Sequence, residues 1–222
     1  MKQALICALT MFLPWKLRRR CLTAFLGYEI APDAHIGYSW VAPEILLMAS
    51  GARIGHLTVC KGLARLEMGA SSSIGRLNWI TGYPIQGTVH FTTEPLRDPS
   101  LVLGPHSAIT NRHIIDCTAL VTIGAFTTIA GFRTQILTHS IDLARCVQRS
   151  SPVEVGEYSF VGSGCILLAG TQLPSRSLLA AGSVLTKRYE VGLTLYAGAP
   201  ARAVKSLPED AEYFKRVFGF VV

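Results

Sequence analysis

Aliphatic residues return at every sixth position along the second half of the chain. Six hexads follow one another without interruption from Val155 to Glu190: VGEYSF, VGSGCI, LLAGTQ, LPSRSL, LAAGSV and LTKRYE. Further hexads open upstream at Ile30, Ile36, Ile54 and Ile74, at Ile109, Ile115 and Val121, and, after a shift of two positions, at Ile123 and Ile129. A period of six suits neither an amphipathic helix nor an alternating strand. It suits a short strand and a turn repeated many times, so the pattern predicts an all-β solenoid, a parallel β-helix of hexapeptide repeats.

Two segments interrupt the period. Residues 81–100, TGYPIQGTVHFTTEPLRDPS, carry three prolines, and residues 137–152, LTHSIDLARCVQRSSP, are rich in polar groups. Insertions in a solenoid leave the stack as loops, and loops on a rigid scaffold often carry function. His139 opens the second insertion, which favours a functional role for it over that of a solvated loop histidine.

The pattern divides the chain into three parts: an N-terminal helical or amphipathic segment at 1–28, a β-helix at 29–200, and a tail at 201–222 that we expect to be helical. The apolar stretch ALICALTMFLPW is too short to span a bilayer and contains Pro14. Its basic cluster, Lys16 and Arg18 to Arg20, follows the apolar residues, unlike the order in a signal peptide. The segment is expected either to pack on the protein body or to lie on an anionic membrane surface.

Composition adds few constraints. Half of the 222 residues are hydrophobic, 16% are charged, and the net charge of +7 favours an anionic partner. Nucleic acid is disfavoured, because no basic helix or mixed aromatic and basic module is present. Six scattered cysteines form no C-x-x-C pair, which argues against a zinc site or a disulfide framework and for a reduced, cytoplasmic chain.

The C-terminal run AAGSVLTK…YAGAPARAVKSL closely resembles the end of the hexapeptide-repeat acyltransferases, notably the maltose/galactoside, xenobiotic and polysaccharide O-acetyltransferases. The resemblance covers roughly residues 103–207. It implies a left-handed β-helix, an exception to the usual crossover handedness, with short terminal helices. It also implies a homotrimer that binds acetyl-CoA between subunits and acetylates a hydroxyl of a saccharide or glycan precursor.

The resemblance assigns roles to individual positions. His139 corresponds to the catalytic base, and the backbone amide near Ser163 faces the thioester oxygen. The expected cofactor-binding residues are Ser163, Gly164, Ala181, Gly182, Thr186, Lys187, Arg202 and Lys205. The expected acceptor-binding residues are Asn111, His113, Asp116 and Arg133. Phe160 replaces a common tryptophan and Tyr189-Glu190-Val191 replaces a usual proline pair, so the acceptor need not be a simple sugar.

Acyl transfer to a hydroxyl needs a base near neutral pH and a donor for the developing oxyanion, and imidazole and a backbone N–H supply them. No metal or acyl-enzyme is required. We expect Asp142 to act with His139 as a catalytic residue, and the sequence leaves open whether Asp142, Asp116 or a main-chain carbonyl orients the imidazole. Three other functions stay open: an acyltransferase using acyl carrier protein, a non-catalytic trimeric scaffold, and a metalloenzyme of the γ-carbonic anhydrase type. The metalloenzyme needs three histidines on adjacent coils, two of them usually five residues apart. No two of the six histidines in this chain have that spacing.

Overall fold

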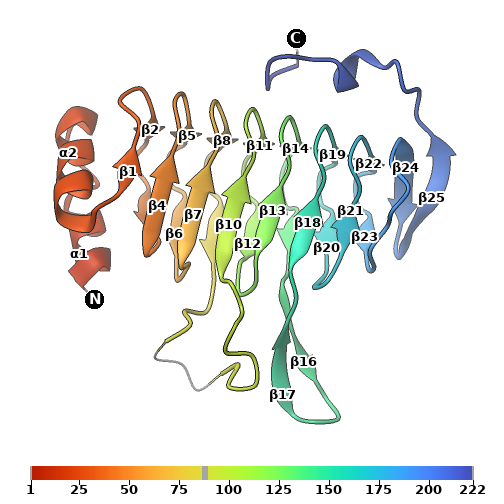
Figure 1. Cartoon of the computed structure of the whole chain (residues 1–222), viewed down its shortest axis with the longest axis horizontal. Coiled ribbons are helices and arrows are strands. Elements are labelled where there is room, and N and C mark those ends of the chain that lie inside the picture. Colours follow the sequence, from red (N-terminus) through yellow and green to blue (C-terminus); the bar gives the residue numbers. More distant parts are fainter. Residues whose placement is uncertain (1, 87–89, 222) are drawn as a thin grey trace.

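The computed structural model describes residues 2–86 and 90–221, which form a three-sided solenoid with its axis along the molecule (Figure 1). The first sheet contains β1 (Glu29–Ile30), β4 (Ile45–Met48), β7 (Arg65–Met68), β10 (Ser100–Leu103), β13 (Val121–Ile123), β18 (Val153–Val155) and β21 (Gln172–Leu173). The second contains β2 (His35–Ile36), β5 (Arg53–Ile54), β8 (Ser73–Ile74), β11 (Ala108–Ile109), β14 (Thr128–Ile129), β19 (Phe160–Val161), β22 (Leu178–Leu179), β24 (Thr194–Gly198) and β25 (Ala201–Ser206). The third contains β3 (Trp40–Ala42), β6 (Val59–Lys61), β9 (Trp79–Thr81), β12 (Ile114–Asp116), β15 (Gln135–Ile136), β20 (Ile166–Leu167) and β23 (Val184–Leu185).

The hexad residues form the core, as the period predicts. Ile115 of β12 pairs in parallel with Ile80 of β9 and Ile136 of β15, and all three side chains are buried. The shift of two positions also has a structural reason. In β13 both Val121 and Ile123 point inward, because a three-residue strand buries its first and third side chains.

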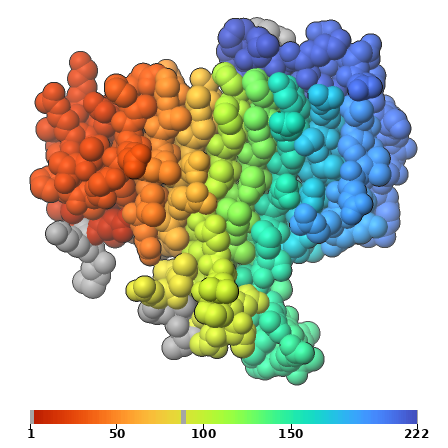
Figure 2. Space-filling view, viewed as in Figure 1, coloured from red at the N-terminus to blue at the C-terminus, as the bar shows by residue number. Residues whose placement is uncertain are grey.

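Two of the three edges of the solenoid, here called corners, position the candidate site. Corner 2 joins the second sheet to the third and carries Leu57, Leu77, Arg112 and Arg133, all at positive φ between 58° and 65°. Corner 3 joins the third sheet to the first, and both predicted insertions leave the solenoid there, side by side (Figures 1 and 2). Each strand of the third sheet therefore connects one position on corner 2 with one on corner 3.

The N-terminal segment is helical, as expected: α1 (Lys2–Leu9) and α2 (Trp15–Leu26) cover the end of the first coil (Figure 1). Arg18, from the basic cluster, is only 1% exposed. Its guanidinium donates to the carbonyl oxygens of Gly37 and Ser39, each at 2.7 Å. A coil at the end of a solenoid has no neighbour to pair with its carbonyls, and Arg18 takes that place. No helix in the described ranges is long and apolar enough to cross a membrane.

We expect Arg18→Ala to lower the free energy of unfolding by about 2–4 kcal/mol, because two buried carbonyls lose their donor. Arg20→Ala, an exposed arginine of the same helix, should change it by no more than about 0.5 kcal/mol. Denaturant unfolding of the two variants measures the difference. Equal effects would show that Arg18 does not cap the coil.

The expectation of a helical tail at 201–222 is wrong for its first part. β25 pairs antiparallel with β24, because the last coil leaves an edge that a returning strand can satisfy. Only a short 3-10 helix, Glu212–Phe214, follows. The tail then runs back along the solenoid (Figure 1), where Tyr213 donates to the Ser159 carbonyl at 3.1 Å.

Candidate active site

The insertions at corner 3 form one projecting lobe (Figure 2). The second insertion is a hairpin of β16 (His139–Asp142) and β17 (Val147–Ser150), and the first joins β9 to β10. The carboxylate of Glu94 in the first insertion accepts hydrogen bonds from Ser150 N at 2.8 Å and Ser150 Oγ at 2.6 Å. Two segments more than fifty residues apart are thereby joined beside His139.

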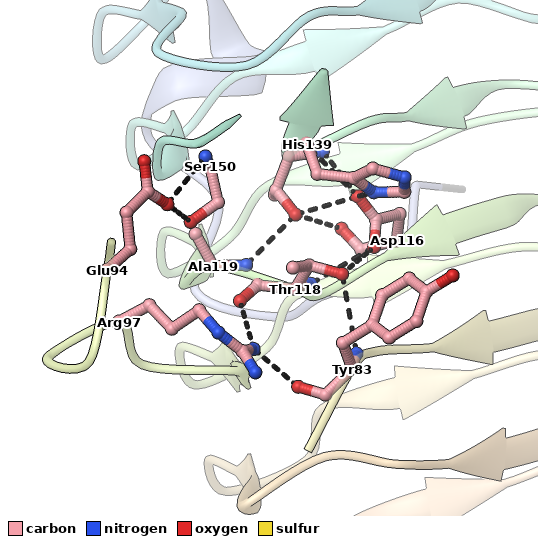
Figure 3. A network of polar contacts seen from close by, with 9 residues as sticks. Tyr83, Glu94, Arg97, Asp116, Thr118, Ala119, His139 and Ser150 are labelled. Atoms are coloured by element: carbon pink, nitrogen blue, oxygen red, sulfur yellow. Dashed lines mark hydrogen bonds and ion pairs between the residues drawn. The ribbon is translucent and has the colours of Figure 1, made fainter. Parts of the chain in front are cut away.

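His139, the first residue of the hairpin, pairs with Asp116 at the end of β12 (Figure 3). Nδ1 of the imidazole lies 2.7 Å from Oδ2 of the carboxylate. An ionised carboxylate only accepts, so Nδ1 carries the hydrogen and donates it. This bond leaves the Nε2 lone pair free, on a side chain that is 35% exposed. The geometry is that of an oriented general base.

Asp116 is itself held by several donors. Its Oδ2 accepts from the backbone N–H groups of Thr138 at 2.8 Å and His139 at 3.0 Å. Its Oδ1 accepts from Thr118 N at 3.1 Å and Thr118 Oγ1 at 2.6 Å. Burial would raise the pKa of Asp116, but the hydrogen bonds from His139, Thr118 and Thr138 outweigh burial and lower it to about 2. The carboxylate stays ionised, and its hydrogen bond raises the pKa of His139 above the ordinary histidine value despite partial burial.

Aromatic side chains of the first insertion flank the imidazole. The rings of Tyr83 and Phe91 meet the His139 ring edge-on, with centroids 5.8 Å and 6.0 Å away. The Arg97 guanidinium lies 4.7 Å from the Phe91 ring centroid and donates to the carbonyls of Thr118, Tyr83 and Pro84. The first insertion thus packs around His139. The broken hexad period located this loop, but no sequence signal identified these side chains within it.

Asp142 does not orient His139, which corrects the expectation that these two residues act together. It lies at the other end of β16, where it accepts from Arg145 N at 3.1 Å and pairs with Arg149 at 3.7 Å. Three residues of extended strand separate it from His139 by about 10 Å, on the opposite face. Asp116, expected at the acceptor, fills this role instead.

His113 cannot serve as an acceptor ligand in this chain, because it is 1% exposed within corner 2. Its Nε2 lies 2.9 Å from Thr110 Oγ1, and its Nδ1 accepts the Thr134 N–H at 3.1 Å. Burial lowers its pKa to about 4, so the ring stays neutral. Buried and exposed positions alternate along this hexad, and His113 falls on a buried position between the exposed Arg112 and Ile114.

The other expected acceptor residues lie on the outside of corner 2. Asn111 is half-buried, and its Oδ1 accepts the Arg76 N–H at 2.8 Å. Arg133 is exposed. Within one chain, the third sheet separates both residues from His139.

The expected cofactor residues occupy three places. Ser163, Gly164, Ala181 and Gly182 continue corner 2 beyond Arg133. Thr186 and Lys187 follow β23 on corner 3, and Arg202 and Lys205 lie on β25. One chain therefore does not gather them around a single ligand.

No group of three or more potential metal ligands is found in residues 2–86 and 90–221.

By sequence, no protein-family model and no curated protein matches the chain significantly. Solved structures do match its fold. The polysialic acid O-acetyltransferase OatWY is 13% identical, with a TM-score of 0.54 over 84% of this chain and 90% of that one. The hexapeptide-repeat acetyltransferase VCA0836 from Vibrio cholerae, complexed with acetyl coenzyme A, is 20% identical, with a TM-score of 0.49 over 94% and 87%. The chain thus shares the fold of OatWY, and its parallel sheets fit the left-handed parallel β-helix that its sequence predicts.

Proposed function

We propose that this protein transfers an acetyl group from acetyl-CoA to a hydroxyl of a saccharide or glycan precursor. The observation that carries the proposal is the His139–Asp116 pair, with Nε2 free beside two insertions that flank it. The fold shared with an enzyme described as a polysialic acid O-acetyltransferase supports it.

In the proposed reaction, Nε2 of His139 takes the proton of the acceptor hydroxyl as its oxygen attacks the thioester carbonyl. The ionised Asp116 stabilises the imidazolium that forms. The tetrahedral oxyanion needs a donor, and the N–H of Ser163 makes no hydrogen bond within the described part of the chain. Collapse breaks the carbon–sulfur bond, and the imidazolium returns its proton to the leaving CoA thiolate. Acetylated acceptor and free CoA result, without an acyl-enzyme.

The scattered cofactor residues support assembly as a homotrimer with acetyl-CoA between subunits. Corner 2 carries Ser163, Gly164 and Gly182, whereas His139 projects from corner 3. Because the family resemblance places acetyl-CoA between subunits, we propose that the donor lies between corner 3 of one copy and corner 2 of the next. Light scattering of the purified protein should give three times the monomer mass. A monomer that still transfers acetyl groups would contradict this assembly.

Acetyl-CoA and a panel of saccharides, with release of free CoA as the readout, test the function itself. We expect acceptor-dependent release that requires acetyl-CoA. Transfer only from acylated acyl carrier protein would instead identify a different donor. Failure to bind or consume either donor would indicate a non-catalytic scaffold.

We further propose that the N-terminal cap touches an anionic membrane surface in the cytoplasm. Leu5, Leu9 and Phe12 are exposed, Phe12 by 75%, next to the exposed cations Lys16 and Arg20. Apolar burial and about 1 kcal/mol for each basic residue near the surface favour such contact.

Flotation with phosphatidylserine vesicles checks the membrane contact. The protein should float, and the double variant Leu9→Asp/Phe12→Asp should lose most of this binding. Phe220→Asp, which changes an exposed residue of the tail, should float like the unchanged protein. Absence of the unchanged protein from the vesicle fraction would refute the contact.

A further inference from the structure

Three neighbouring strands of the third sheet connect the surroundings of His139 to a row of arginines. The strands β9, β12 and β15 lie side by side. At corner 3 they lead to Tyr83, Asp116 and His139, and at corner 2 they begin just after Arg76, Arg112 and Arg133. The arginines occupy successive coils, since Arg112 N donates to the Arg76 carbonyl and Arg133 N to the Arg112 carbonyl, each at 3.0 Å.

The positive charge of this row is not neutralised within the chain. The guanidinium groups of Arg76, Arg112 and Arg133 make no hydrogen bond or ion pair to any described residue, and all three side chains are exposed. The corner 2 segments at 55–59, 75–79, 110–114 and 130–135 contain no Asp or Glu. Coils are spaced by about 4.8 Å, so three like charges repel one another along the edge. An anionic ligand would relieve that repulsion.

The row borders a hollow and a partly apolar floor. A hollow of about 460 Å³ at corner 2 is lined by side chains that include Arg76, Arg112 and Phe132. On the outer face of the sheet, Trp79 is 49% exposed and Ile114 is 48% exposed. Asp116 lies four residues after Arg112, at the far end of β12, which is at most about 13 Å away. This distance is long enough for more than one sugar ring.

We propose that the outer face of β9, β12 and β15 binds an acidic saccharide as the acceptor, with its carboxylate or phosphate groups on the arginine row and a hydroxyl at His139. Arginine binds such anions through two parallel hydrogen bonds. The half-exposed indole of Trp79, which has Lys61 Nζ 5.7 Å from its ring centroid, offers an aromatic ring to a sugar and adds a cation to this face. The inference rests on the proposed function and specifies its acceptor class.

Binding in the absence of acetyl-CoA tests the site independently of catalysis. By calorimetry, polygalacturonate should bind the unchanged protein at least about tenfold more tightly than neutral dextran, with affinity that falls as salt rises. Arg112→Gln should weaken polygalacturonate binding about tenfold, and the triple variant at residues 76, 112 and 133 by more than that. Arg176→Gln is the matched control, because Arg176 is an exposed arginine at positive φ on a different corner. It should bind like the unchanged protein.

Two comparisons separate this inference from its rivals. Trp79→Ala should weaken binding of polygalacturonate but not of polyglutamate, which has no sugar ring. Equal affinity of the unchanged protein for both polymers, or for single-stranded RNA, would overturn the saccharide assignment. The triple variant should keep its affinity for acetyl-CoA. Undiminished acetyl transfer to saccharides by the triple variant would refute the acidic acceptor and leave the proposed function standing. Binding of acidic saccharides without any acetyl transfer would refute the proposed function and leave the saccharide-binding site standing.

Discussion

His139→Ala should lower kcat for acetyl transfer by about 10²–10⁴-fold while the Kd for acetyl-CoA stays unchanged. The loss follows from removing the group that accepts the hydroxyl proton, a contribution of this order for a positioned base. The free Nε2 and the 2.7 Å bond from Nδ1 to Asp116 make His139 the described residue best placed for the role. Steady-state CoA release and calorimetric titration with acetyl-CoA separate the two effects.

A control for this variant exists at the opposite side of the solenoid. His106 stacks on Phe126 with ring centroids 4.8 Å apart, away from both insertions. His106→Ala should leave kcat within about twofold of the unchanged protein, a shift smaller than about 0.4 kcal/mol. Normal turnover by His139→Ala at saturating acetyl-CoA would remove the basis of the proposed mechanism.

Asp116→Asn should reduce kcat by on the order of 10²–10⁴-fold and also change the pH profile. Asp116 raises the pKa of His139, so the base becomes neutral, and the enzyme active, only as pH rises through a value above 6.5. Without the carboxylate the pKa of the imidazole falls, and the acidic limb of kcat/KM moves to lower pH. A merely structural role of Asp116 would lower the rate without moving this limb. Asp142→Asn is the matched control in the hairpin and should leave both the rate and the limb in place.

The same pair predicts how stability depends on pH. The pKa of Asp116 is lowered from 3.8 to about 2 on folding. The contribution of Asp116 to the free energy of unfolding, on the order of 2 kcal/mol, is therefore complete above pH about 4. It is lost as pH falls toward 2. His139 has a raised pKa, so its contribution is complete below pH about 6.5 and is lost as pH rises above the folded value. As the pH is lowered from 5 to 2.5, the melting temperature should fall less steeply for Asp116→Asn than for the unchanged protein.

Sequence alone predicts a role for His139 but does not predict which carboxylate pairs with it. Asp142, three positions along the chain, is one of the partners that the sequence leaves open, yet β16 carries it to the far end of the hairpin. Asp116 lies 23 residues away along the chain but on the adjacent coil, since Ile115 pairs with Ile136. Stacking the hexads one coil apart would have placed Asp116 two positions from His139. The step from Ile115 to Ile136 is 21 residues instead of the 18 of three hexads, although it contains neither insertion, and this longer coil obscured the alignment.

The arginine row shows a related limit. Arg133 was an expected acceptor residue, and His113 was its expected neighbour there. The structure turns His113 into the corner and brings Arg76, from a distant hexad, beside Arg112. Inward or outward direction at a corner depends on backbone φ, and Arg112 and Arg133 adopt positive values there. A hexad pattern records buried positions well but does not report which exposed residues become neighbours.

The sequence by itself determined the solenoid, the positions of both insertions and the histidine at the start of the second. These features follow from local periodicity, because one aliphatic residue in each hexad has to face a common axis. The tertiary structure decided that Asp116 orients His139, that Tyr83 and Phe91 flank it, and that three arginines form a row at the other end of the same strands. Those contacts join residues one or two coils apart, and their register depends on the exact length of every intervening turn and loop.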